Sequence, residues 1–125
     1  MTDLKSRRCV PCEGGVLALE THVVEQLLAK LSGWVLEMAE RDLPPCISKN
    51  YRFKNYHETM AFVNATAWVS HREDHHPDLT VSYNACRVSY TTHAIGGLSE
   101  NDFICAEKID ALFDPAIVYA KGARM

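Results

Sequence analysis

The sequence predicts a single α+β domain in which helices pack on one face of an antiparallel sheet. The chain has 125 residues, which suits one domain of ordinary size. Hydrophobic residues make up 47% and charged residues 23%, as in soluble globular proteins rather than disordered or fibrous ones. Hydrophobic periodicities follow the order helix, strand, strand, helix, strand, strand, helix, and that order is typical of the α+β class.

The first half of the chain predicts a helix followed by a hairpin. From Thr21, apolar residues recur at helical spacing as far as Leu31, and Gly33 just beyond supplies a stop. Residues 34–38 then alternate between apolar and polar, which predicts a strand. The run Asp-Leu-Pro-Pro at 42–45 predicts a turn, and the alternation resumes over a second strand that ends at Phe53.

The second half predicts a long helix, two strands and a last helix. Asn55 and Glu58 have the spacing of a capping box, which predicts the start of the long helix. This helix is expected to end near Glu73, because Pro77 disfavours helix at His76. The remaining expectations are a strand over 79–83, a bend at 84–85, a strand over 86–92, a break at 96–97, and a helix from the capping-box pair Ser99 and Asp102 through Leu112.

The chain divides into a polar tail, residues 1–18, which contains the pair Gly14-Gly15, and a domain, residues 19–125. The tail holds the pair Cys9-Val10-Pro11-Cys12, but a structural zinc site needs a second pair and none follows at the usual spacing. A redox Cys-x-x-Cys is expected between a strand and a helix. We therefore interpret the tail as free of chemistry, with a metal or redox role as the alternative. The other cysteines are interpreted as small buried hydrophobes: Cys46, Cys86 and Cys105.

Charge and hydropathy limit the possible partners. The 13 Lys and Arg against 16 Asp and Glu give a net charge of −3, which argues against nucleic-acid binding through the net field. The basic residues near the N-terminus precede no apolar segment of the kind a secretory signal has. No stretch approaches the roughly 20 apolar residues that span a bilayer. We expect a cytoplasmic protein that binds neither nucleic acid nor membrane.

The histidines carry the strongest functional signal. Three of the six fall within six residues: His71, His75 and His76. His75 and His76 stand where the long helix is predicted to end, and Pro77 stiffens the connection that presents them. His93 is predicted at the end of the last strand, on its more polar face. Antiparallel pairing is expected to bring His93 near His75 and His76.

Three such imidazoles allow two kinds of chemistry. An imidazole has an ordinary pKa near 6.5, so both protonation states are available at neutral pH for a reaction that needs one acid and one base. Three histidines also form zinc sites. The residues alone leave both possibilities open. His22 and His57 have only structural interpretations, and a capping role accounts for Asp102.

A resemblance to a known family narrows this choice. Seven residues at fixed spacing carry it: His71-x3-His75-His76-Pro77-x5-Tyr83-x9-His93-x8-Asp102. Every position and every gap resembles the signature of the pterin-4a-carbinolamine dehydratases. The similarity covers roughly residues 20 to 115 and looks closest to the bacterial branch, where a Cys-x-x-Cys tail also occurs.

The resemblance implies a specific reaction. Such enzymes convert 4a-hydroxytetrahydropterin, which an aromatic amino acid hydroxylase produces, to quinonoid dihydropterin and water, and so support tetrahydropterin recycling. They need no metal and no organic cofactor. Their fold is a four-stranded antiparallel sheet with helices on one face, and they assemble as dimers or tetramers. Both features are expectations for this chain.

The resemblance also assigns a site. It implies acid–base catalysis by three histidines, His75, His76 and His93. It further implies that the pterin pocket is lined by Pro77, Thr92, Ala94 and Ile95. Asp102 is implied to contribute an orienting carboxylate beside them.

The chain departs from the family pattern at two positions. His71 replaces a usually acidic residue, and Leu79 stands where animal members often have an aromatic residue. Helical geometry is expected to point Glu73 and Asp74 away from the site, so neither replaces the missing carboxylate. We expect these changes to tune affinity more than identity.

Two other functions remain as alternatives. Animal relatives also bind a homeodomain transcription factor, so this chain could be an interaction protein, but a pure scaffold would not require all three histidines. The other alternative is a three-histidine metal enzyme, which elemental analysis would identify.

Overall fold

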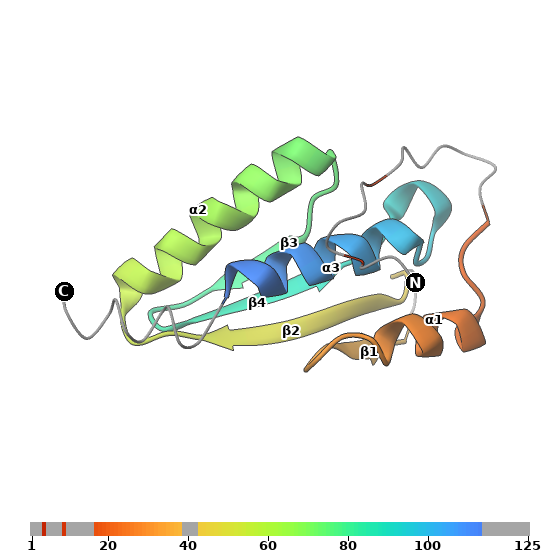
Figure 1. Ribbon diagram of the computed structural model, residues 1–125, viewed down its shortest axis with the longest axis horizontal. Helices are drawn as coiled ribbons and strands as arrows, with labels where there is room; N and C mark the ends of the chain where they lie inside the picture. The colour runs from red at the N-terminus through yellow and green to blue at the C-terminus, as the bar shows by residue number, and fades with distance from the viewer. Residues whose placement is uncertain (1–3, 5–8, 10–16, 39–42, 114–125) are drawn as a thin grey trace.

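The computed structural model describes residues 4, 9, 17–38 and 43–113. In these residues a four-stranded antiparallel sheet has the strand order β1-β2-β4-β3 (Figure 1). The strands are β1 (Val35–Glu37), β2 (Cys46–Arg52), β3 (Asp78–Val81) and β4 (Ala85–Tyr90). The helices are α1 (Thr21–Leu28), α2 (Tyr56–Glu73) and α3 (Glu100–Leu112). The predicted α+β class and element order are confirmed, while the boundary between tail and domain at residue 18 stays a prediction.

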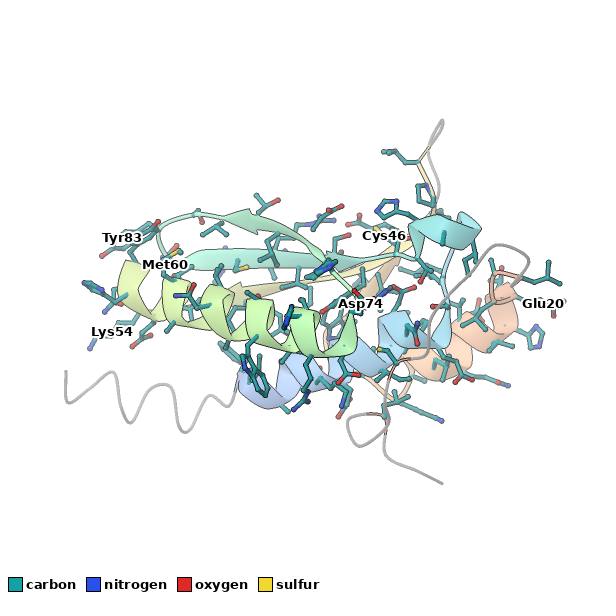
Figure 2. The ribbon with its side chains drawn as sticks, turned by 90° about the horizontal axis from the view of Figure 1, so that it is seen from above. Glu20, Cys46, Lys54, Met60, Asp74 and Tyr83 are labelled. Carbon is teal, nitrogen blue, oxygen red and sulfur yellow. The ribbon has the colours of Figure 1, made fainter. Side chains whose placement is uncertain are left out.

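The core lies between the sheet and the helices. Helices α2 and α3 pack on each other over one face of the sheet (Figures 1 and 2). Along β4, Cys86, Val88 and Tyr90 are completely buried while the residues between them are partly exposed, so the strand alternates as expected for a sheet covered on one face. From β2, Tyr51 meets Phe62 of α2 with ring centroids 4.6 Å apart.

The long helices begin and end where local signals predict. The Asn55 side chain accepts a hydrogen bond from the Glu58 amide at 2.9 Å, and Glu58 Oε1 accepts from the Lys54 amide. Because Glu58 reaches the amide of Lys54 rather than that of Asn55, this first box is only half formed, whereas Ser99 and Asp102 form the second predicted capping box with both bonds. In the described part of the chain, no helix is long and apolar enough to cross a membrane.

Helix α1 is shorter than the periodicity predicts. It ends at Leu28, because the amides of Lys30 and Leu31 bond to carbonyls three residues back, at 3.1 and 3.0 Å, and tighten the chain into a turn. Gly33 follows with φ 82°. The apolar spacing continues through these residues, but the backbone is no longer helical.

Strand β4 also ends early. It stops at Tyr90 rather than residue 92, because Thr92 forms an isolated bridge with Gly97 that closes a small loop. Within that loop lies a 3-10 turn, η2 (His93–Ile95), and Gly96 follows in the left-handed conformation at φ 65°. Asp42, part of the predicted turn, lies outside the described residues.

Asp110 of α3 ties the helix to the sheet. Its carboxylate accepts from Trp34 Nε1 at 3.1 Å, from Lys49 Nζ at 2.8 Å and from the Tyr51 hydroxyl. Burial and the hydrogen bond to Asp110 raise the pKa of Tyr51 far above its ordinary value, so its hydroxyl stays a donor. We therefore expect the contacts of Asp110 to contribute strongly to the free energy of unfolding.

Asp110→Ala is expected to lower the free energy of unfolding by about 2–4 kcal/mol, because partly buried donors lose their common acceptor. Urea denaturation measures the change. Glu25→Ala on the exposed side of α1 is the control and should stay within about 0.5 kcal/mol of the unmodified chain. Equal stability of both variants would show that this carboxylate does not hold α3 to the sheet.

Candidate active site

A pocket of about 510 Å³ opens where the end of α2, the segment after β4 and the start of α3 meet. Its lining residues are Cys9, Arg72, Glu73, Asp74, His75, His76, Thr91, Thr92, His93, Ala94 and Asn101. The pocket therefore joins the two histidine segments that lie far apart in the sequence.

The end of α2 directs His75 and His76 to this pocket. Asp74 follows the helix with φ 53°, in the left-handed conformation that reverses the chain (Figure 2). The amide of His75 then bonds to the Ser70 carbonyl at 3.1 Å, and the amide of Asp74 bonds to the carbonyl of residue 71. These two bonds form a Schellman motif, which here uses aspartate where glycine is usual.

Asp74→Val is expected to destabilise the chain by about 1–2 kcal/mol, because a β-branched residue fits poorly at positive φ. Asp74→Gly is the matched variant and should be at least as stable as the unmodified chain, since glycine adopts this conformation without strain. Urea denaturation of both variants gives the comparison. If the valine and glycine variants unfold together, the left-handed turn does not constrain this position.

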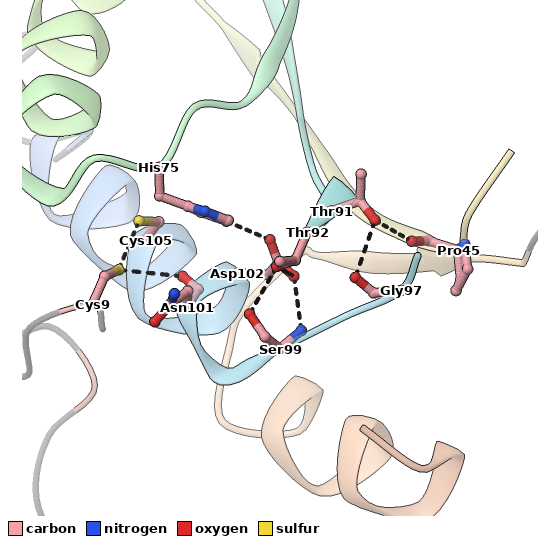
Figure 3. Close-up of polar contacts among 10 residues, drawn as sticks. All are labelled: Cys9, Pro45, His75, Thr91, Thr92, Gly97, Ser99, Asn101, Asp102 and Cys105. Atoms are coloured by element: carbon pink, nitrogen blue, oxygen red, sulfur yellow. Dashed lines mark hydrogen bonds and ion pairs between the residues drawn. The ribbon is translucent and has the colours of Figure 1, made fainter. Parts of the chain in front are cut away.

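His75 is fixed from two sides. Its Nε2 lies 2.6 Å from Asp102 Oδ1 (Figure 3). Its ring also stacks on Tyr90, with 5° between the planes and 5.6 Å between the centroids. The side chain is 12% exposed. A carboxylate only accepts hydrogen bonds, so Nε2 carries the proton and Nδ1 is the nitrogen left for other chemistry.

Asp102 serves the helix and the histidine at once. It is completely buried, and its Oδ2 accepts from the Ser99 amide at 3.0 Å and from the Thr92 hydroxyl at 2.8 Å. The hydroxyls of Thr92 and Ser99 are 2.7 Å apart. The carboxylate thus caps α3 with one oxygen and orients His75 with the other.

His93 and His76 reach the same pocket as exposed side chains. His93 does not end a strand, as the alternation predicts, but begins the turn η2. A 3-10 turn rotates each residue by about a third of a circle, so successive side chains point in different directions. Accordingly, Ala94 lines the pocket with His93 and Ile95 does not.

Two of the residues predicted to contact pterin are not among those that line this pocket: Ile95 at the end of η2, and Pro77 just before β3. Their part in pterin binding stays a prediction. Asp102 lies behind His75 rather than in the lining. The remaining predicted residues line the pocket: His75, His76, His93, Thr92 and Ala94.

The expectation for Glu73 is wrong. Its side chain lines the pocket and is 1% exposed, with Oε1 accepting from the Cys9 amide at 3.0 Å and Oε2 lying 3.3 Å from Arg72 Nε. Lys108 Nζ lies 4.0 Å from the same oxygen. A negative charge in the last turn of a helix interacts unfavourably with the helix dipole. An acidic residue at this position was therefore a signal in the sequence that Glu73 has partners from elsewhere in the fold. Asp74, which the same argument excluded, also lines the pocket.

Sequence reasoning missed four other lining residues. Cys9 was placed in a tail, and nothing in the local pattern marks Arg72, Thr91 or Asn101.

Burial raises the pKa of Tyr90, which stays a neutral platform for His75. Among the described residues, no three His, Cys, Asp or Glu side chains gather as a metal site would require.

Comparison with known proteins places this chain among the dehydratases, enzymes that release water from a substrate. The family described as pterin 4 alpha carbinolamine dehydratase matches residues 18–112, and the chain belongs to this family. Relatives named as proposed pterin-4-alpha-carbinolamine dehydratases support the assignment. One from Nitrosospira multiformis is 60% identical, covering 89% of this chain and 93% of the relative, and one from Nitrosomonas europaea is 62% identical, covering 89% and 94%.

Solved structures support the fold. A transcriptional coactivator/pterin dehydratase from Brucella melitensis superposes with a TM-score of 0.68 at 27% identity, covering 76% of this chain and 97% of that one. A pterin dehydratase-like protein, described as a RuBisCO assembly factor in the alpha-carboxysome, superposes with a TM-score of 0.55 at 23% identity, covering 65% and 89%, and shows the fold alone. The predicted family and fold are confirmed.

Proposed function

We propose that this chain dehydrates a 4a-hydroxytetrahydropterin to quinonoid dihydropterin by histidine acid–base catalysis. The observation that carries the proposal is the arrangement around His75, whose ring is held by Asp102 and Tyr90 in a pocket that His76 and His93 also line. Family membership supports the substrate class, and the pocket supplies the groups that the reaction needs.

His75 is suited to act as the base. With Nε2–H donating to Asp102, Nδ1 can accept the N5 proton of the pterin, and the carboxylate stabilises the imidazolium that forms. The electrons of the N5–H bond form the C4a–N5 double bond as the C4a–O bond breaks, so that C4a keeps four bonds throughout.

The acid comes from the exposed histidines. His93 or His76, as an imidazolium, protonates the oxygen on C4a, so that the C–O bond breaks and water leaves instead of hydroxide. The acid has then lost one proton and His75 has gained one. Exchange with water restores both, since the pocket is open to solvent. Each step is worth roughly 10²–10⁴-fold in rate.

We further propose that the reaction uses no metal and no organic cofactor, because both proton transfers are assigned to side chains of the pocket. Elemental analysis of the purified, active chain tests this. We expect less than stoichiometric zinc and iron, and activity that survives a chelator. Stoichiometric metal that is lost together with activity would favour the three-histidine metal enzyme instead.

The proposal includes a homo-oligomer, dimer or tetramer, and a functional link to an aromatic amino acid hydroxylase. A coupled assay tests the link: a hydroxylase turns over with a small amount of tetrahydropterin and an excess of reductase. Adding the chain is expected to raise the steady-state rate, because carbinolamine no longer accumulates. An unchanged rate, with dehydration shown to be limiting, would contradict the link.

A further inference from the structure

Two cysteines meet at the wall of the pocket. Cys9 Sγ lies 3.3 Å from Cys105 Sγ, although the residues are 96 positions apart in the sequence (Figure 3). Cys9 is also held by its amide, which donates to Glu73, and its Sγ lies 3.7 Å from the Asn101 carbonyl. Both cysteines are free thiols. The proposed dehydration makes no use of them.

The two thiols differ in access. Cys9 is half-buried and lines the pocket, so small molecules in the pocket can reach its sulfur. Cys105 is completely buried on α3 behind it. An accessible thiol beside a second, resolving thiol is the arrangement that redox-sensitive cysteines use. Cys46 is also half-buried, but its neighbour is not a second thiol. Its Sγ lies 3.5 Å from a carboxylate oxygen of Glu37.

We propose that Cys9 and Cys105 form a redox modification site, which a hydroperoxide converts to an intrachain disulfide at the wall of the pocket. The bond would fix Cys9 to α3, beside Glu73 and Asn101. This proposal is independent of the dehydration, and mass spectrometry can read its chemistry without an activity assay.

The chemistry balances with hydrogen peroxide as the two-electron oxidant. The Cys9 thiol loses its proton, its sulfur attacks one oxygen and the O–O bond breaks, and the hydroxide that leaves takes up that proton, so that a sulfenic acid and one water form. Cys105 sulfur then attacks Cys9 sulfur, the S–O bond breaks, and the leaving hydroxide takes the Cys105 proton to form a second water. Two thiols are oxidised and one peroxide is reduced.

The order of the steps follows from the environment of the thiols. The hydrogen bond with Cys9 and burial raise the pKa of Cys105 well above the ordinary value, so Cys105 keeps its proton and is a poor first nucleophile. Its sulfur is nevertheless close enough to attack an oxidised Cys9 with only a small movement of either side chain. Cys9 is therefore oxidised first.

Peptide mapping of the full chain tests the proposal. The chain is treated with hydrogen peroxide, remaining thiols are blocked, and the chain is digested without reductant. We expect a peptide pair joined through Cys9 and Cys105, and its loss after dithiothreitol. Closing so long a loop should also raise the midpoint of thermal unfolding by roughly 5–15 °C. Cys12→Ser and Cys46→Ser are controls that should keep the joined pair.

Other products would overturn the proposal. A link between Cys9 and Cys12 would show that the motif in the tail reacts by itself. Cys9 that stops at a sulfenic or sulfinic acid would show that Cys105 does not resolve it. Unmodified Cys9 under conditions that oxidise a free cysteine would show that the pocket does not expose the thiol.

Discussion

Replacing His75 by glutamine is expected to lower the rate constant of dehydration by roughly 10²–10⁴-fold. Glutamine can still donate a hydrogen bond to Asp102 from its amide, but no group on it takes up a proton near neutral pH. The variant should therefore stay folded and lose the proposed base. Stopped-flow absorbance of the 4a-carbinolamine measures the rate, and circular dichroism checks the fold.

Two further variants test whether the loss of activity is specific to histidines that line the pocket. His93→Ala should also slow the reaction, because His93 shares the pocket with His75. His22→Ala should leave the rate unchanged, since His22 lies exposed on α1 and its ring is 3.4 Å from Glu20 rather than near the pocket. Full turnover by the His75→Gln variant would remove this residue from the mechanism.

Asp102→Ala is expected to lower the free energy of unfolding by about 3–5 kcal/mol. The Ser99 amide, the Thr92 hydroxyl and His75 Nε2 all lose the same buried acceptor. The matched control is Glu100→Ala, a carboxylate in the same first turn of α3 but exposed, which should change stability by less than about 1 kcal/mol.

Asp102→Asn separates stability from chemistry. Asparagine keeps one acceptor for the cap of α3, so most of the stability should remain. It has no negative charge to stabilise a protonated His75, so the dehydration rate should fall by roughly 10²-fold. If the asparagine variant turns over normally, Asp102 caps the helix and has no part in positioning the base.

Local signals in the sequence predicted much of the fold. Each predicted pair of capping residues stands three apart: Asn55 caps α2 through the amide of Glu58, and Ser99 and Asp102 form the reciprocal box that begins α3. The alternation in β4 correctly placed Val88 and Tyr90 toward the core. Such patterns depend on neighbours along the chain, so one sequence is enough to interpret them.

The errors arise where distant contacts decide the structure. β4 ends at Tyr90 because Thr92 bridges to Gly97, and this bridge moves His93 from a strand to a turn. Glu73 faces the pocket because it accepts from the amide of Cys9, which is 64 positions away in the sequence. No local periodicity encodes such a contact.

Asp102 makes one contact that its local spacing predicts and another that only the fold creates. Its spacing from Ser99 predicted the cap, which forms. Only the fold reveals that the second oxygen of the same carboxylate reaches His75, which lies 27 positions earlier in the sequence. The resemblance to the dehydratases supplied the expectation of an orienting carboxylate, and the geometry gives a physical reason for it.

The most direct test of the account is the decay of 4a-hydroxytetrahydropterin, followed by absorbance, with the chain present at a small fraction of the pterin concentration. We expect the decay to quinonoid dihydropterin to accelerate in proportion to the amount of chain, with many turnovers for each chain. A decay no faster than the spontaneous reaction in buffer would contradict the proposed function.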